Sequence, residues 1–308
     1  MISFTQQVKT EVSKLEISKI DSIAELSAII YNIGDFKKNI KITTENASVA
    51  RRIFNLIKLN FNINLKITVR KGFNFNKNYI YILELNYDSN ILYSLGIYEN
   101  NKILDVPKEY IIDDVEQKMS YLRGVFLSIG SVNDPKKSRY HLEFLVGNES
   151  YSKFLCNLLN EFRLNSKVIK RDNKFMVYVK EAEKIGDFLR ILNAYNAVFY
   201  FEDIRIYRDH KNMTNRLNNC EQANIDKVIM TADNQIKQIE IIKQHDGFDL
   251  LSDKEKIVAE YRLKYREVSL VELSEIISVE TGIPITKSGL HHRFDKIKKL
   301  SERFTKNE

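Results

Sequence analysis

Two nine-residue stretches decide the fold: Leu26-Ser27-Ala28-Ile29-Ile30-Tyr31-Asn32-Ile33-Gly34 and Leu122-Arg123-Gly124-Val125-Phe126-Leu127-Ser128-Ile129-Gly130. The second begins ninety-six positions after the first, counting from 26 to 122. Each is a largely apolar helical stretch that ends at a glycine, and recurrence at a fixed offset indicates an internal repeat. We therefore expect one structural plan that the chain uses twice.

Downstream of both stretches the apolar pattern changes from helical to alternating, which is typical of strands. The predicted strands are Lys38 to Thr44, Leu65 to Lys71 and Tyr79 to Leu85 in the first copy, and Arg139 to Val146, Lys167 to Arg171 and Phe175 to Val179 in the second. The predicted helices are Ala47 to Leu59 and Asn90 to Ile97 in the first copy, and Glu149 to Leu159 and Glu183 to Leu192 in the second. The expected class is α+β, with two three-stranded sheets that pair into a saddle.

Small residues recur at equivalent positions of the two repeated helices: Ala28 and Gly34 in one, Gly124 and Gly130 in the other. Small side chains at a crossing let two backbones approach closely. We therefore expect all four residues to lie at a contact between the helices, along a pseudo-twofold axis. The alternative is that Gly34 and Gly130 simply end their helices.

The remainder of the chain predicts an all-α module. Residues from Tyr207 to Asn224 are polar and rich in Asn and Arg, and a helix is expected only from Ile225 to Gln244. Three shorter helices follow, at Ser252 to Lys264, Ser269 to Ser278 and Lys287 to about Phe304. The expected domains are 1–204, with repeats at about 20–98 and 115–204, a linker with a bridging helix at 205–246, and a helix-turn-helix domain at 247–308.

The last predicted helix has one apolar face, with Leu290, Phe294 and Ile297, and one polar face. A basic helix that follows a short helix and a turn is typical of a recognition helix in the DNA major groove. The alternative is a generic three-helix bundle with a basic end, and the acidic Asp295 on the polar face favours this alternative. We favour DNA binding, and the candidate contact residues are Lys287, Ser288, His291, His292, Arg293, Lys296 and Lys299.

Basic residues also follow the predicted strands. Lys66, Arg70, Arg139, Lys170 and Arg171 are candidate phosphate contacts, accompanied by Lys71 and Lys167. The alternative is that they are the solvated face of two antiparallel sheets, where basic residues are normal. The sequence leaves these two interpretations equal.

Composition sets limits on the class of protein. The net charge of +7 over 308 residues permits a polyanionic partner. Cys156 and Cys220 form no CxxC pair, so neither a disulfide framework nor a zinc site is indicated, and no metal or other cofactor is expected. The sequence has no apolar run long enough to cross a bilayer and no secretion signal, so we expect a cytoplasmic protein without a membrane partner.

The tandem plan resembles the LAGLIDADG homing endonucleases, whose motif normally carries an acidic residue at the penultimate position. The resemblance implies that these two acids hold metal ions over the scissile phosphates. Ile33 and Ile129 stand at the matching positions, and isoleucine offers no oxygen ligand. We therefore expect no catalytic residues and no enzyme activity. The alternatives are an endonuclease that uses Asp35 or Asp134, and an RNA-binding, maturase-like protein.

The whole chain resembles the WhiA family of bacterial regulators. The resemblance rests on strings that span the chain: Ser3-Phe4-Thr5, Arg123-Gly124-Val125-Phe126-Leu127, Gly130-Ser131-Val132-Asn133-Asp134-Pro135, Tyr140-His141-Leu142-Glu143, Phe201-Glu202-Asp203, Asn215-Arg216-Leu217-Asn218-Asn219-Cys220-Glu221, Ala223-Asn224 and Thr286-Lys287-Ser288-Gly289-Leu290-His291-His292-Arg293. It implies a nucleoid-associated, sequence-specific DNA-binding regulator linked to sporulation, cell division or chromosome segregation. The implied partners are promoter DNA and an RNA polymerase sigma factor or another regulator.

Overall fold

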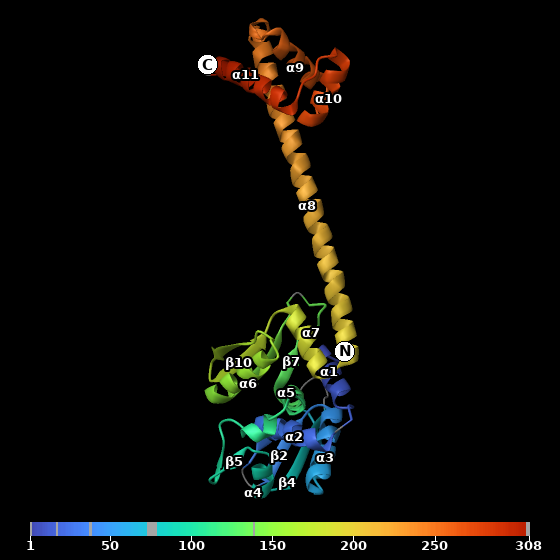
Figure 1. Cartoon of the computed structure of the whole chain (residues 1–308), viewed down its shortest axis with the longest axis vertical. Coiled ribbons are helices and arrows are strands. Elements are labelled where there is room, and N and C mark those ends of the chain that lie inside the picture. The colour runs from blue at the N-terminus through green and yellow to red at the C-terminus, as the bar shows by residue number, and fades with distance from the viewer. Residues whose placement is uncertain (1, 17, 37–38, 73–78, 138, 306–308) are drawn as a thin grey trace. The chain divides into compact units, whose positions relative to one another are not determined.

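The computed structural model describes residues 2–16, 18–36, 39–72, 79–137 and 139–305. The chain divides into two compact units, Met1–Arg208 and Asp209–Glu308, which are described separately (Figure 1). No helix in the described ranges is both long enough and apolar enough to span a bilayer.

The N-terminal unit is built from two copies of one α/β plan, as the sequence predicts. The first copy contains α2 (Lys19–Ile33), β1 (Gly34–Asp35), β2 (Asn39–Thr44), α3 (Ala47–Phe61), β3 (Lys66–Lys71), β4 (Tyr79–Asn86) and α4 (Ser89–Ser94). The second contains α5 (Val115–Ile129), β7 (Gly130–Val132), β8 (Leu142–Val146), α6 (Glu149–Glu161), β9 (Lys167–Arg171), β10 (Lys174–Val179) and α7 (Ala182–Ile191). The helix α1 (Phe4–Val12) precedes the first copy, and β5 (Tyr98–Glu99), β6 (Lys102–Ile103) and the 3₁₀ helix η1 (Glu109–Ile112) connect the two.

Each sheet has four antiparallel strands, in the orders β1-β2-β4-β3 and β7-β8-β10-β9. The prediction of three strands per sheet was wrong because the backbone becomes extended at Gly34 and Gly130 and pairs at once with β2 or β8. Strands of two or three residues are too short to show alternation in a sequence. Similarly, β8 begins at Leu142 rather than Arg139, while Lys38, where β2 was predicted to begin, lies outside the described residues.

The helices α2 and α5 pack against each other through the middle of this unit. A Cβ built on Gly124 would lie 2.9 Å from the Cβ of Ala28 and closer still to the carbonyl oxygen of Glu25, so the backbones touch here. The predicted contact is therefore correct for Ala28 and Gly124. It is wrong for Gly34 and Gly130, because a Cβ on either would meet a residue of the same repeat copy, Phe36 at 2.8 Å or Phe126 at 2.7 Å.

A buried cluster of charged residues lies beside this crossing. The guanidinium of Arg52 on α3 donates to both carboxylate oxygens of Glu25 on α2, with Nη2 to Oε2 at 2.8 Å, and both side chains are almost wholly buried. Arg123 on α5 lies 3.6 Å from the same carboxylate. The cluster links both copies of the repeat, and a buried pair of this kind is costly to break by removing one partner.

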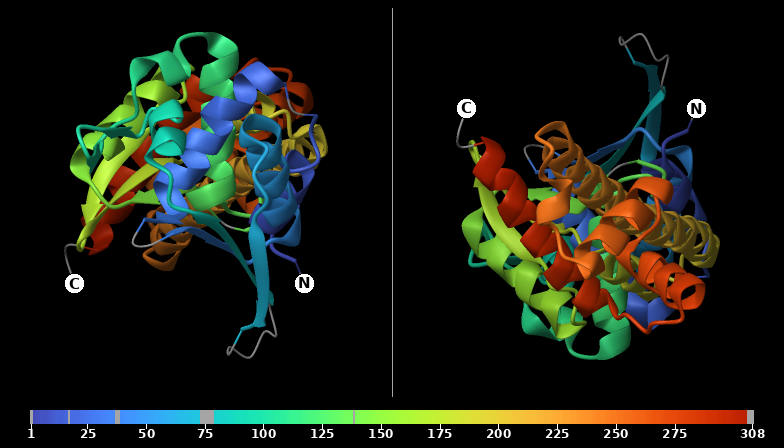
Figure 2. Two further views of the ribbon diagram at one scale, coloured as in Figure 1. Left: turned by 90° about the horizontal axis from the view of Figure 1, so that it is seen from below. Right: turned by 90° about the horizontal axis from the view of Figure 1, so that it is seen from above.

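The β3–β4 hairpin extends beyond the helices that cover the rest of its sheet (Figure 2). Ile67 and Val69 on β3 are consequently about half exposed, although they face the same side of the sheet as buried Leu83.

The helix α8 (Tyr195–Gln244) runs without a break across residues that the sequence analysis assigned to a non-helical segment, Tyr207 to Asn224. That prediction was wrong because Arg favours helices and Asn disfavours them only slightly. Glycine and proline are the residues that end helices, and neither occurs in α8. Glu11 on α1 accepts hydrogen bonds from the backbone N–H groups of Asn196 (2.7 Å) and Ala197 (3.0 Å), which caps the start of α8.

The C-terminal unit is all-α. The last part of α8 packs with the 3₁₀ helix η2 (Gly247–Leu250), α9 (Asp253–Lys264), α10 (Leu270–Thr281) and α11 (Lys287–Thr305) around an apolar core of its own. Ser252 and Ser269, where two of the predicted helices begin, are N-caps and form capping boxes with Glu255 and Glu272. A Cβ on Gly247 would lie 2.6 Å from the ring of Phe304, so a glycine is needed where the end of α11 packs.

Candidate nucleic-acid interface

The ends of α2 and α5 carry no acidic residue at the motif positions. Ile33 and Ile129 are half-buried and pack against the apolar core of the N-terminal unit. Asp35 lies in β1, paired in register with Lys41, and therefore belongs to a strand and not to a continuation of α2. The carboxylate of Asp134 accepts hydrogen bonds from the backbone N–H of Lys136 (2.9 Å) and the hydroxyl of Tyr200 (3.3 Å). Within the described ranges no group of three or more His, Cys, Asp or Glu residues could hold a metal ion.

The strand register decides which basic residues share the open face of each sheet. In the first sheet, Lys66 pairs with Glu84 and Arg70 pairs with Ile80. These residues point to the side of the sheet opposite to buried Leu83, so Lys66 and Arg70 lie on the open face. In the second sheet, Lys167 and Arg171 face the same way as Tyr178, opposite to buried Val177.

Two of the predicted phosphate-contact residues, Lys170 and Arg139, do not lie on the open face of a sheet. Lys170 pairs with Phe175 on the helix-covered side of the sheet, where its charge helps to lower the pKa of Glu149 after the larger effect of Lys153. Arg139 is exposed in the segment before β8, outside the strands. Alternation along a strand places neighbouring residues on opposite faces, so a row of basic residues cannot all face one ligand.

The helices α10 and α11 form a helix-turn-helix. Gly282 ends α10 in the left-handed conformation, with φ of 69°, and the Thr286 hydroxyl accepts a hydrogen bond from the N–H of Gly289 (3.1 Å), which caps α11. Leu273 and Ile277 of α10 pack with Leu290, Phe294 and Ile297 of α11 in the core. The polar face of α11 is thereby held outward.

The seven candidate residues of α11 divide into three groups. Ser288, His292 and Lys299 are exposed on the side opposite to the buried Leu290, Phe294 and Ile297. Lys296 lies 3.4 Å from the carboxylate of Glu255 on α9, and Arg293 is half-buried. Lys287 and His291 line a cavity between α11 and α8, and Ser288 of the first group lies at this cavity as well.

The pKa of Glu255 lies below its ordinary value. Burial acts to raise this pKa, but hydrogen bonding at Ser252 and the neighbouring Lys296 outweigh it. Lys296 therefore has an ion-pair partner within the domain, and it is a poorer candidate for phosphate contact than Lys299.

The sequence did not identify two buried polar side chains of this unit, which are Gln235 on α8 and Arg262 on α9. A signal for Gln235 was present, because it lies on the apolar stripe of α8, three residues after Ala232 and four before Ile239. Arg262 gave no such signal, since an arginine near a helix end is usually exposed.

Comparisons with known proteins agree along the whole chain. Family models match at residues 19–98 (WhiA N-terminal LAGLIDADG-like domain), 118–211 (WhiA LAGLIDADG-like domain) and 214–301 (WhiA C-terminal HTH domain). A probable cell division protein WhiA from Staphylococcus haemolyticus is 42% identical, covering 100% of this chain and 99% of that protein. The corresponding Staphylococcus aureus protein is 40% identical with the same coverage.

Solved structures give the same result. The crystal structure of full-length WhiA from Thermatoga maritima is 27% identical, with a TM-score of 0.58, covering 98% of this chain and 99% of that one. The isolated N-terminal LAGLIDADG domain of WhiA is 26% identical, with a TM-score of 0.51, covering 62% of this chain and 90% of that one. The predicted fold class, a tandem LAGLIDADG-like unit followed by a helix-turn-helix, is confirmed, and the chain belongs to the WhiA family.

Proposed function

We propose that the protein is a sequence-specific DNA-binding regulator that reads duplex DNA with α11 and does not cleave it. The observation that carries the proposal is the outward face of α11, where Ser288, His292 and Lys299 are exposed on a capped helix held by a helix-turn-helix core. Polar side chains on such a face recognise base edges, and the lysines neutralise phosphates. The name of its relatives, probable cell division protein, leads us to place this regulator in cell division. Chromosome segregation or sporulation is a related role that we add from the family resemblance alone.

The open faces of the two sheets are a second contact surface in this proposal. Lys66, Arg70, Lys167 and Arg171 are the basic residues predicted from the sequence that lie there. We place Arg139 and Lys170 outside this surface. The protein would act in the cytoplasm on the nucleoid, with promoter DNA as its ligand and a sigma factor or another regulator as a protein partner.

The test measures binding of the full chain to duplex DNA by fluorescence anisotropy. A duplex enriched from a random pool is compared with the unselected pool over a range of salt concentrations. We expect Lys299→Ala to weaken both complexes and to lower the salt slope by about one, because one phosphate contact is lost. We expect His292→Ala to cost about 1–3 kcal/mol on the selected duplex and little on the pool.

The control is Lys254→Ala, which removes an equal charge from an exposed position of α9. It should bind both DNAs as the parent does. If both α11 variants retain the parent affinity and salt slope, α11 is not the reader and the proposal fails.

A further inference from the structure

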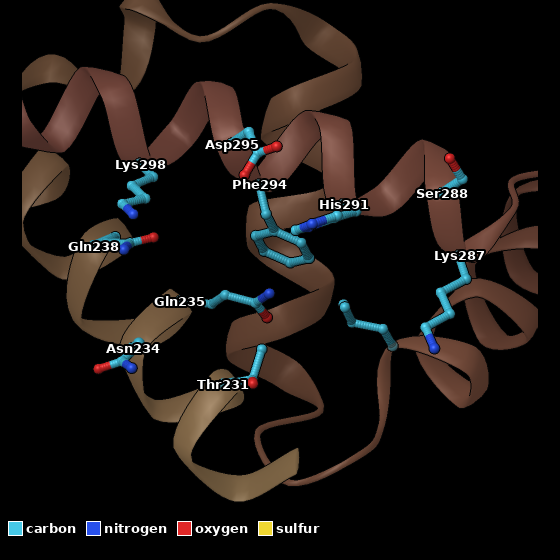
Figure 3. Close-up of a pocket in the computed structure, with 11 residues that line it drawn as sticks. Thr231, Asn234, Gln235, Gln238, Lys287, Ser288, His291, Phe294, Asp295 and Lys298 are labelled. Carbon is cyan, nitrogen blue, oxygen red and sulfur yellow. The ribbon is translucent and has the colours of Figure 1, made fainter. Parts of the chain in front are cut away.

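A polar cavity lies within the C-terminal unit, between the last part of α8 and α11 (Figure 3). Its volume is about 670 Å³, within the range of small-molecule sites. Asn234, Gln235 and Gln238 extend from α8, and Lys287, His291 and Lys298 from α11. The walls therefore combine amide groups with cationic side chains, and Phe294 supplies an aromatic ring.

Gln235 is the lining residue that points most directly to a bound ligand. Its side chain is only 6% exposed, and its Oε1 is buried without a hydrogen-bond partner in the described part of the chain. It reaches from α8 toward Phe294 and His291 (Figure 3). Buried carbonyl oxygens are almost always paired, and an aliphatic side chain would suit the neighbouring Ala232 and Ile236 better. An N–H donor from a bound molecule would satisfy this oxygen.

Arg262 is a second unusual group, beside a smaller cavity of about 230 Å³ that shares Thr231, Leu270 and Lys287 with the first. The side chain is 1% exposed, and burial lowers the pKa of its guanidinium. Its Nη1 donates to the carbonyl oxygens of Tyr265 (3.3 Å) and Val268 (2.8 Å). Its Nε has no hydrogen-bond partner in the described part of the chain, and its guanidinium carbon lies 5.7 Å from the centroid of the Phe294 ring.

The charges near these cavities favour an anion. Arg262, Lys287 and Lys227 line the smaller cavity, and it contains no acidic residue among those that line it. Lys287 and Ser288 belong to the first turn of α11, where backbone N–H groups and the helix dipole attract phosphate. In the larger cavity Asp295 is the acidic side chain, and Lys287 and Lys298 are the two lysines that oppose its charge.

The unpaired amide oxygen of Gln235, beside the ring of Phe294, would bind a planar ring that carries N–H donors. The cationic side chains of Lys287 and Arg262 would bind phosphate. We propose that these adjoining cavities bind a free nucleoside phosphate, with its base in the larger cavity against Gln235 and Phe294 and its phosphates toward Lys287 and Arg262. Lys287, Ser288 and His291 would then contact both this ligand and DNA, so the ligand would regulate DNA binding. That regulatory part rests on the proposed function, whereas ligand binding itself does not.

The test is calorimetric titration of the full chain with ATP, GTP, pyrophosphate and a six-nucleotide single-stranded DNA. We expect one nucleoside triphosphate to bind with a Kd in the range of about 1–100 μM, tighter than pyrophosphate. Gln235→Leu should weaken that binding at least tenfold while the melting temperature stays at or above that of the parent, because an unpaired polar group is replaced by an apolar one. Lys298→Ala, at an exposed position, should weaken it as well.

The matched control is Gln244→Leu, the same exchange at an exposed position of α8 outside the cavity, which should bind like the parent. The proposal is wrong if no nucleotide binds up to about 1 mM, if binding is unchanged in Gln235→Leu and Lys298→Ala, or if only the oligonucleotide binds. DNA binding by α11 is measured separately by anisotropy, so failure here leaves the proposed function intact.

Discussion

Lys9 on α1 is the residue whose ionisation most clearly opposes folding. Its side chain is nearly buried, its ammonium group lies 3.5 Å from the carbonyl oxygen of Ser128 at the end of α5, and burial lowers its pKa from 10.5 to about 8. Below pH 8 the proton is bound in both the folded and the unfolded chain, and the folded state carries the full cost of burying the charge. Above about pH 10.5 neither state is charged, so the cost disappears as the pH rises between these values.

Replacing this side chain by one without charge should therefore stabilise the protein at neutral pH. A pKa lowering of this size corresponds to about 3 kcal/mol, so we expect Lys9→Met to raise the free energy of unfolding by up to about that amount at pH 7 and by little at pH 10.5. Denaturant titrations at the two pH values measure the difference. The exposed Lys14→Met serves as the control and should change little at either pH, and an equal effect of Lys9→Met at both values would contradict the explanation.

At the scale of elements, the contact between α2 and α5 depends on one missing side chain. A Cβ at position 124 would lie against the Glu25 backbone and 2.9 Å from the Cβ of Ala28, so the helices would have to separate. We expect Gly124→Ala to lower the free energy of unfolding by about 1–3 kcal/mol or more, the usual cost of overpacking.

Gly147→Ala provides the comparison, because a Cβ there would have no atom within 4 Å. Urea unfolding of both variants should show a lower midpoint for Gly124→Ala, and for Gly147→Ala a free energy of unfolding within about 0.5 kcal/mol of that of the parent. Equal midpoints would mean that the crossing is looser than described.

Long helices with one buried face were predictable from the sequence. Very short strands and an exposed polar helix were not. The apolar periodicity of α3, α6 and α11 matches their observed bounds closely, because each buries one face along its whole length. The strands β1 and β7 were missed, since two or three residues show no period and form only because β2 and β8 lie beside them. The first half of α8 was missed because exposed polar residues give no stripe, although nothing in them breaks a helix.

At the scale of the whole molecule, two-metal cleavage would need an acid from each half of the repeat, and the motif positions carry Ile33 and Ile129 instead. We expect purified full-length protein with Mg²⁺ to leave supercoiled plasmid intact under conditions in which it binds DNA. Agarose electrophoresis of the plasmid measures this. The decisive contrary outcome is nicking that Asp35→Ala or Asp134→Ala abolishes.

The sequence by itself determined the repeat, the fold class and the absence of acids at Ile33 and Ile129, because each of these is a matter of residue type and local spacing. It also indicated the polar face of α11 that Ser288, His292 and Lys299 occupy. Only the tertiary structure decided that Lys170 lies on the helix-covered side of its sheet, that Lys296 pairs with Glu255, and that Gln235 and Arg262 are buried beside cavities. These outcomes depend on which distant elements pack together, and the burial of one residue against a partner far along the chain leaves no periodic pattern in the sequence.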